Sequence, residues 1–97
     1  MAGQDAIIIE LDATNWRDGV DFYRSLLKAI GAPEWHGMNV NAFIDSIIHG
    51  DINTIDPPFT VRITGTSNVP ADVREGIDVL MQYIRPANAQ VEWELLP

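Results

Sequence analysis

Hydrophobic residues recur along this chain with two different periods, which predict strands alternating with helices. Residues 6–11 form a run that is nearly apolar on both faces, and such a run is typical of the central strand of a parallel sheet. Residues 59–64 and 90–95 alternate between apolar and polar positions, as expected for strands with one buried and one wetter face. The pattern therefore predicts three strands.

Three segments between these strands repeat apolar residues at helical spacing. We expect helices at 18–30, 40–49 and 70–85. Asp18 and Asn39 are good N-cap residues for the first two helices, and Gly31 and Gly50 are typical residues at which a helix stops. Pro70 suits the first turn of the third helix.

The resulting order, β-α-α-β-α-β, predicts an α/β fold. Strands that alternate with helices favour a three-stranded parallel sheet with right-handed crossovers and helices packed against it. Because the first strand alone is apolar on both faces, we place it in the centre, which gives the strand order 2-1-3. The length of 97 residues fits a single domain that spans residues 1–97.

The net charge of the chain favours some classes of binding partner over others. Fourteen acidic residues face six basic ones, a net charge of −8, which disfavours direct contact with nucleic acid or membranes and attracts basic proteins. Acidity that merely keeps a small protein soluble is the alternative. The sequence has no cysteine, no basic leader and no apolar run of transmembrane length, so we expect a cytoplasmic protein in a reducing compartment.

Residues with catalytic or metal-binding chemistry form no recognisable set. The chain has no glycine-rich phosphate loop and no cysteine nucleophile, and neither histidine has a convincing serine partner. His49 follows Asp45 by four residues, but no third ligand stands at a recognised spacing. Paired carboxylates, Glu34 and Asp45, stay open as an acid–base alternative. We expect no metal, no cofactor and no enzymatic activity.

The loop and helix start around residues 33–46 carry the candidate binding site. Gly37 is expected in a tight turn with positive φ. The rings of Trp35 and His36 fit either a binding surface or a plug of the core, whereas Trp16 and Trp93 are assigned to the core. The helical spacing places a ridge of four residues on one side of the second helix: Asn41, Ile44, Asp45 and Ile48.

One stretch resembles a known protein family. It reads Pro33-Glu34-Trp35-His36-Gly37-Met38-Asn39-Val40-Asn41-Ala42-Phe43-Ile44-Asp45. This resembles the barstar family, whose pattern is Pro-Glu-aromatic-aromatic-Gly-x-Asn, an apolar residue, an acid, Ala, an apolar residue, usually Trp, and Asp. The length and the element order also fit a barstar-like fold over nearly the whole chain.

The resemblance implies a proteinaceous inhibitor, or immunity protein, that blocks the active site of a basic ribonuclease or nuclease toxin. In that family the second helix and its preceding loop enter the nuclease active site, and the aspartate matching Asp45 takes the place of a substrate phosphate. The partner-binding residues implied here are Trp35, His36, Val40, Asn41, Ile44, Asp45 and Tyr83.

Three of these residues depart from the family pattern. Asn41 stands where a second acid is usual, Ile44 replaces the usual Trp, and Tyr83 stands where barstar has an interface glutamate. The departures favour a target other than barnase, or a member that has lost inhibition. The alternative function is a barstar-like interaction module with a non-nuclease partner, and a small enzyme is third.

Overall fold

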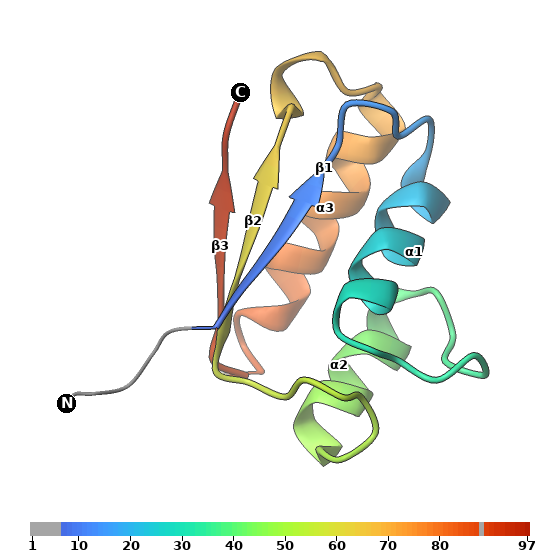
Figure 1. Cartoon of the computed structure of the whole chain (residues 1–97), viewed down its shortest axis with the longest axis vertical. Coiled ribbons are helices and arrows are strands. Elements are labelled where there is room, and N and C mark those ends of the chain that lie inside the picture. The colour runs from blue at the N-terminus through green and yellow to red at the C-terminus, as the bar shows by residue number, and fades with distance from the viewer. Residues whose placement is uncertain (1–6, 88) are drawn as a thin grey trace, which may run out of the picture.

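The chain folds in the predicted order of strands and helices in a computed structural model, which describes residues 7–87 and 89–97. The elements are β1 (Ile8–Asp12), α1 (Gly19–Ala29), α2 (Val40–His49), β2 (Phe59–Thr64), the short 3₁₀ helix η1 (Thr66–Asn68), α3 (Ala71–Ile84) and β3 (Val91–Leu95) (Figure 1). Observed and expected boundaries agree within two residues, and residue 6, the expected start of the first strand, lies outside the described residues.

The three strands form one parallel sheet in the order β1-β2-β3, so the prediction of a central first strand is wrong. Ile8 is apolar yet 43% exposed, and its hydrophobicity therefore does not report a central position. The order 2-1-3 would place Glu10 beside the acidic strand β3. The observed order instead puts Arg62 between Glu10 and Glu94, and opposite charges on neighbouring strands attract where like charges repel.

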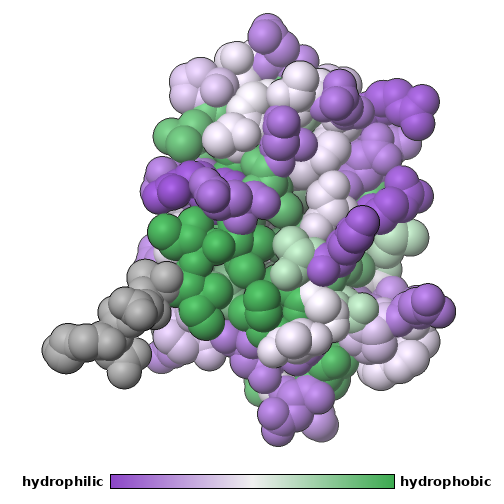
Figure 2. All heavy atoms as spheres, viewed as in Figure 1, coloured by the Kyte–Doolittle hydropathy of each residue, from purple (hydrophilic) through white to green (hydrophobic). Residues whose placement is uncertain are grey.

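The helices pack on one face of this sheet and leave the other face open (Figure 1). On the open face, Arg62 Nε donates a hydrogen bond of 3.0 Å to Glu94, and Arg62 Nη1 lies 3.5 Å from Glu10. The hydrogen bond and charge of Glu94 raise the pKa of Arg62 above its ordinary value. Figure 2 shows a hydrophilic band there, above hydrophobic surface. Ile8, which shares this face of β1 with Glu10, is exposed.

Because side chains alternate along each strand, those that do not point to the open face point toward the helices and form the core. Phe22 and Leu26 of α1 and Ile77 and Leu80 of α3 are fully buried against that set. The strand residues involved are Ile9, Leu11, Phe59, Val61 and Ile63. Because half of each strand faces this single core, one layer of helices suffices to cover the sheet.

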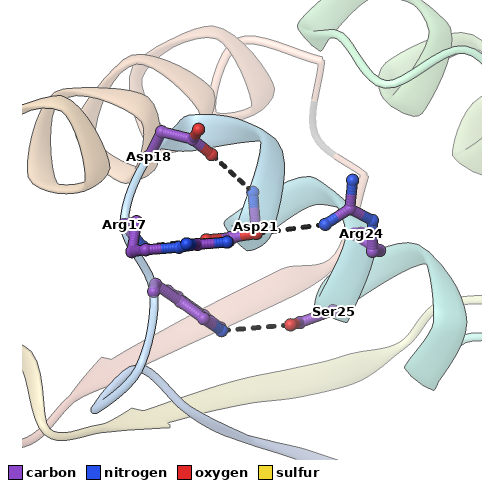
Figure 3. A network of polar contacts seen from close by, with 6 residues as sticks. Arg17, Asp18, Asp21, Arg24 and Ser25 are labelled. Atoms are coloured by element: carbon purple, nitrogen blue, oxygen red, sulfur yellow. Dashed lines mark hydrogen bonds and ion pairs between the residues drawn. The ribbon is translucent and has the colours of Figure 1, made fainter.

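The start of α1 is fixed by the predicted cap and by a group of charges around it (Figure 3). Asp18 accepts a hydrogen bond of 3.1 Å from the backbone N–H of Asp21. The Asp21 carboxylate in turn accepts from the Arg17 backbone at 2.8 Å and from Arg24 Nη1 at 3.1 Å. Trp16, which precedes this group, is buried, as predicted, and its Nε1 donates to Ser25 Oγ at 3.0 Å. Trp93 is only half-buried but packs against the core.

The end of α1 anchors the segment that follows α2. Gly31 has φ of +69° and donates to the Lys28 carbonyl, while the Ala32 N–H reaches the Leu27 carbonyl. This pair of bonds is a Schellman motif, which requires a left-handed residue such as glycine. The Gly31 carbonyl then accepts from the backbone N–H of Thr54 at 3.2 Å, so the connector after α2 is bonded to the end of α1.

Candidate functional site

The outward side of α2 presents the predicted ridge to solvent. Asn41 and Asp45 are exposed, Ile44 is half-buried, and Ile48 is 60% exposed although it is apolar. Phe43, Ser46 and Ile47 form the buried side. The helical period alone produces this division, because positions three and four apart share a face. Asp45 therefore stands in the middle of a solvent-facing strip.

The start of α2 is set by the predicted N-cap. Asn39 has extended backbone angles, and its Oδ1 accepts a hydrogen bond of 2.8 Å from the backbone N–H of Ala42. The prediction of a positive φ at Gly37 is wrong, because the glycines with positive φ in the described chain are Gly31, Gly50 and Gly65. Close packing requires glycine at position 37 instead, since an added Cβ would lie 3.1 Å from Asn39 Nδ2 and 3.2 Å from Ala42 Cβ.

His36 is buried and fastens the loop to α2. Its Nε2 lies 2.8 Å from Ser46 Oγ, and its Nδ1 lies 2.7 Å from the carbonyl of Gly37. Asn53 Nδ2 donates to the same Ser46 Oγ at 3.0 Å, and Ser46 Oγ lies in donating position 2.9 Å from the Phe43 carbonyl. The prediction that neither histidine has a serine partner is therefore wrong for His36. The loop, α2 and the connector after it share one polar network.

The geometry of this histidine–serine pair fits a role in holding the fold together and not a role in catalysis. Ser46 is 3% exposed and His36 is 8% exposed, so a substrate has no access to the hydroxyl. At His36 Nδ1, where a hydrolase would place a carboxylate to orient the base, stands the carbonyl of Gly37, which can only accept a hydrogen bond from that nitrogen. The amide of Asn53 contacts the serine and not the histidine. One sequence signal pointed to the network: Ser46 is a polar residue on the buried side of an apolar helix.

Trp35 and Asp45 lie around a small hollow beside this network. The hollow has a volume of about 180 Å³ and is lined by Trp35, His36, Ala42, Asp45 and Ile52, among others. Trp35 is 75% exposed, so it is not a plug of the core, whereas its neighbour His36 is one. An exposed ring beside an exposed carboxylate forms a contact surface with both apolar and charged character.

Val40 and Tyr83 lie toward the other side of the loop. Val40 is half-buried and lines a second, larger hollow of about 450 Å³ together with Val79 of α3. Tyr83 is 59% exposed and follows Val79 by one helical turn, so it extends the same side of α3. The seven predicted site residues thus divide into an exposed group around Asp45, a half-buried pair of Val40 and Ile44, and buried His36.

Metal-binding geometry is not found in the described part of the chain. No three His, Asp or Glu side chains gather there in a group able to hold an ion. His49 Nδ1 instead lies 2.9 Å from the carbonyl of Gly50, at the end of α2. The candidate acid–base partners Glu34 and Asp45 are both exposed. Among residues 7–87 and 89–97, no helix is long and apolar enough to cross a membrane.

We compared the sequence with known protein families and with curated proteins. The model of one protein family, described as barstar (barnase inhibitor), matches residues 6–96 of the chain. No curated protein matches the sequence. The match includes both the loop-and-helix surface around Asp45 and the sheet that supports it.

Proposed function

Because this chain belongs to the barstar (barnase inhibitor) family, we propose that it is an inhibitor that blocks the active site of a basic ribonuclease or nuclease toxin. The observation that carries the proposal is Asp45, an exposed carboxylate on α2. Among the described residues it has no ion-pair partner within 4.0 Å. Its charge is therefore available to cationic groups of a partner.

A carboxylate in this position suits a site built for phosphate. Nuclease active sites hold a phosphodiester with Arg, Lys or His side chains, and each of these groups can donate a charge-assisted hydrogen bond to Asp45. The carboxylate stands on a helix whose loop is fastened by His36 and Ser46. A surface ordered before binding loses little entropy on docking.

The residues around Asp45 favour a target with an apolar contact surface. Ile44 and Tyr83 stand where the family usually has Trp and Glu, and Ile48 adds a further exposed apolar side chain. Asn41 offers an amide in place of a second acid. We propose that these changes adapt the protein to a ribonuclease other than barnase. They also support the alternative, a family member that binds a non-nuclease protein.

A titration with a substituted inhibitor tests the role of Asp45. Barnase and candidate ribonuclease toxins are titrated with the parent protein and with Asp45→Ala, and both residual RNA cleavage and Kd are measured. Removing one partner of a buried charge pair costs about 2–5 kcal/mol, so we expect at least a ~30-fold loss of affinity. The variant should fold normally, because Asp45 makes no side-chain hydrogen bond within the described structure.

The matched control is Asp78→Ala, which removes the same charge from an exposed position of α3. Asp78 makes only an exposed ion pair with Arg74, and such pairs contribute little. The control should inhibit like the parent. If Asp45→Ala also inhibits like the parent, the barstar-type mechanism does not apply. Capture of a non-nuclease protein by the parent but not by Asp45→Ala would then support the interaction module.

A further inference from the structure

We propose that the larger hollow, on the side of α2 facing α1 and α3, receives an arginine side chain of the protein partner. This inference rests on the proposed function, since it assigns a second contact to the same partner. The hollow has a volume of about 450 Å³ and is open to solvent. Three features of its walls favour an arginine.

The first feature is the apolar wall. Met38 and Val40 line the hollow from the loop and α2, and Val79 lines it from α3. Met38 is 49% exposed, so this wall is reachable from solvent. Arginine and lysine bury their methylene stems on apolar surface of this kind while the charged group stays near polar partners.

The second feature is a pair of carboxylates. Asp72 and Glu75 lie on the same side of α3 and both line the hollow. Neither has an ion-pair partner within 4.0 Å among the described residues, whereas Asp78, which does not line the hollow, pairs with Arg74. Two unpaired negative charges beside an apolar wall complement a cation with an apolar stem.

The third feature is Tyr23, which also lines the hollow and is 8% exposed. Its hydroxyl is buried and has no hydrogen-bond partner in the described structure. A guanidinium has five N–H donors in a fixed plane, which suffice for two carboxylates and a hydroxyl. Its planar face also stacks on aromatic rings, which an ammonium group does less well. These demands favour arginine over lysine.

The hollow lies at the start of the helix that carries Asp45, where Val40 and Asn39 line it. A partner that covers both Asp45 and the start of α2 therefore also reaches the mouth of the hollow. Its cationic active-site groups would meet Asp45, while a separate arginine at the rim of that active site would enter between Asp72 and Val40.

Binding to the ribonuclease that the parent inhibits in the Asp45 titration measures this contact with two matched variants. The hollow variant is Asp72→Asn with Glu75→Gln, and the control variant is Asp78→Asn with Glu92→Gln, which removes two exposed charges elsewhere. Asp45→Ala is measured alongside. We expect the hollow variant to bind roughly tenfold or more weakly than the control variant, as for loss of a desolvated charge contact. The urea midpoints of all variants establish that each one folds.

The outcomes separate this inference from the proposed function. If Asp45→Ala loses affinity but the hollow variant binds like the control variant, the inhibitor function stands and the arginine contact is wrong. If none of the tested ribonucleases binds the parent, NMR titration with L-argininamide decides. Shifts of the Gly76 and Val79 amides that disappear in the hollow variant would support the arginine site. No local shifts in the parent would overturn it.

Discussion

At the residue scale, Asn39 shows how one side chain can fix the start of α2, the helix that carries Asp45. Its Oδ1 accepts from the Ala42 N–H, and this bond satisfies a donor that the first turn of a helix otherwise leaves open. We expect Asn39→Ala to lower the free energy of unfolding by about 1 kcal/mol in urea titrations. Asn41→Ala, two positions later and exposed, is the control and should change it little. Equal effects would show that capping is not the role of Asn39.

Tyr23 predicts a response to alkaline pH. Burial raises the pKa of the Tyr23 phenol above its usual value near 10. The unfolded chain then releases this proton first as the pH rises, so stability from this group is complete below about pH 10 and is lost at higher pH. Tyr23→Phe removes that loss. Urea midpoints at several pH values should fall less steeply above about pH 10 for this variant than for the parent.

Exposed Tyr83 supplies the control for this experiment. Tyr83→Phe should follow the alkaline profile of the parent, because its hydroxyl is not buried. At neutral pH, Tyr23→Phe should be neutral or slightly stabilising, since the lost hydroxyl has no partner in the described structure. A loss of more than about 2 kcal/mol at pH 7 would show that the hydroxyl makes a bond in solution.

Contacts between residues that are close in the sequence could be predicted from it, whereas contacts between residues far apart in the sequence could not. The caps of Asp18 and Asn39 depend on residues three positions apart, so a short motif predicts them. The bond between His36 and Ser46 spans ten residues, and Asn53 joins it from a segment that lacks regular structure. No local pattern predicts such a convergence, although a serine on a buried helix side indicates that some partner exists.

At the scale of elements, strand order shows the limit of the hydrophobic pattern. The pattern located all three strands, but the apolar outer residues of β1 placed it wrongly in the centre. Charge was the better indicator, because Arg62 is basic while Glu10 and Glu94 on the flanking strands are acidic. A basic residue between two acidic strands satisfies both neighbours. The alternation of apolar and polar residues alone does not indicate which strand lies in the centre of the sheet.

The junction between α1 and the connector after α2 gives a second prediction. Gly31 and Gly50 both have positive φ, of +69° and +77°. A Cβ at Gly31 would collide with the side chain of Thr54, whereas a Cβ at Gly50 would meet nothing within 4 Å. Gly50→Ala should therefore lower the free energy of unfolding by about 1–3 kcal/mol from backbone strain alone, because φ of 77° with ψ of 159° lies in a region that is essentially restricted to glycine. Gly31→Ala should lower it by about 1–2 kcal/mol of left-handed strain and by roughly 1–3 kcal/mol more from the collision.

Thermal or urea unfolding of both glycine variants measures the difference. Because Gly50 lies outside the left-handed region, the steric contact is isolated by comparing Gly31→Ala in the parent with Gly31→Ala in a Thr54→Gly background. The loss should be smaller in that background, since Thr54→Gly removes both colliding atoms, Oγ1 and Cβ. An equal loss in the two backgrounds would show that the connector is not held against the end of α1.

At the scale of the whole molecule, the net charge of −8 predicts how fast the protein finds a basic partner. Charges of opposite sign accelerate encounter, and salt screens them beyond about 10 Å at 0.1 M and about 3 Å at 1 M. The association rate constant should therefore fall roughly tenfold or more across this range, while the dissociation rate changes less. Stopped-flow mixing with a basic ribonuclease measures both. An association rate constant that does not change with salt would show that the net charge does not steer the partner electrostatically.

The buried link of His36, Ser46 and Asn53 limits how far the protein can be reduced to its binding motif. A synthetic peptide copying residues 33–49 would contain Trp35 and Asp45 but lack Asn53 and the sheet. Its ten-residue helix is too short to persist alone in water. Each residue ordered only on binding would cost about 1–2 kcal/mol. A peptide mimic would need a staple between the loop and the helix, where His36 now reaches Ser46.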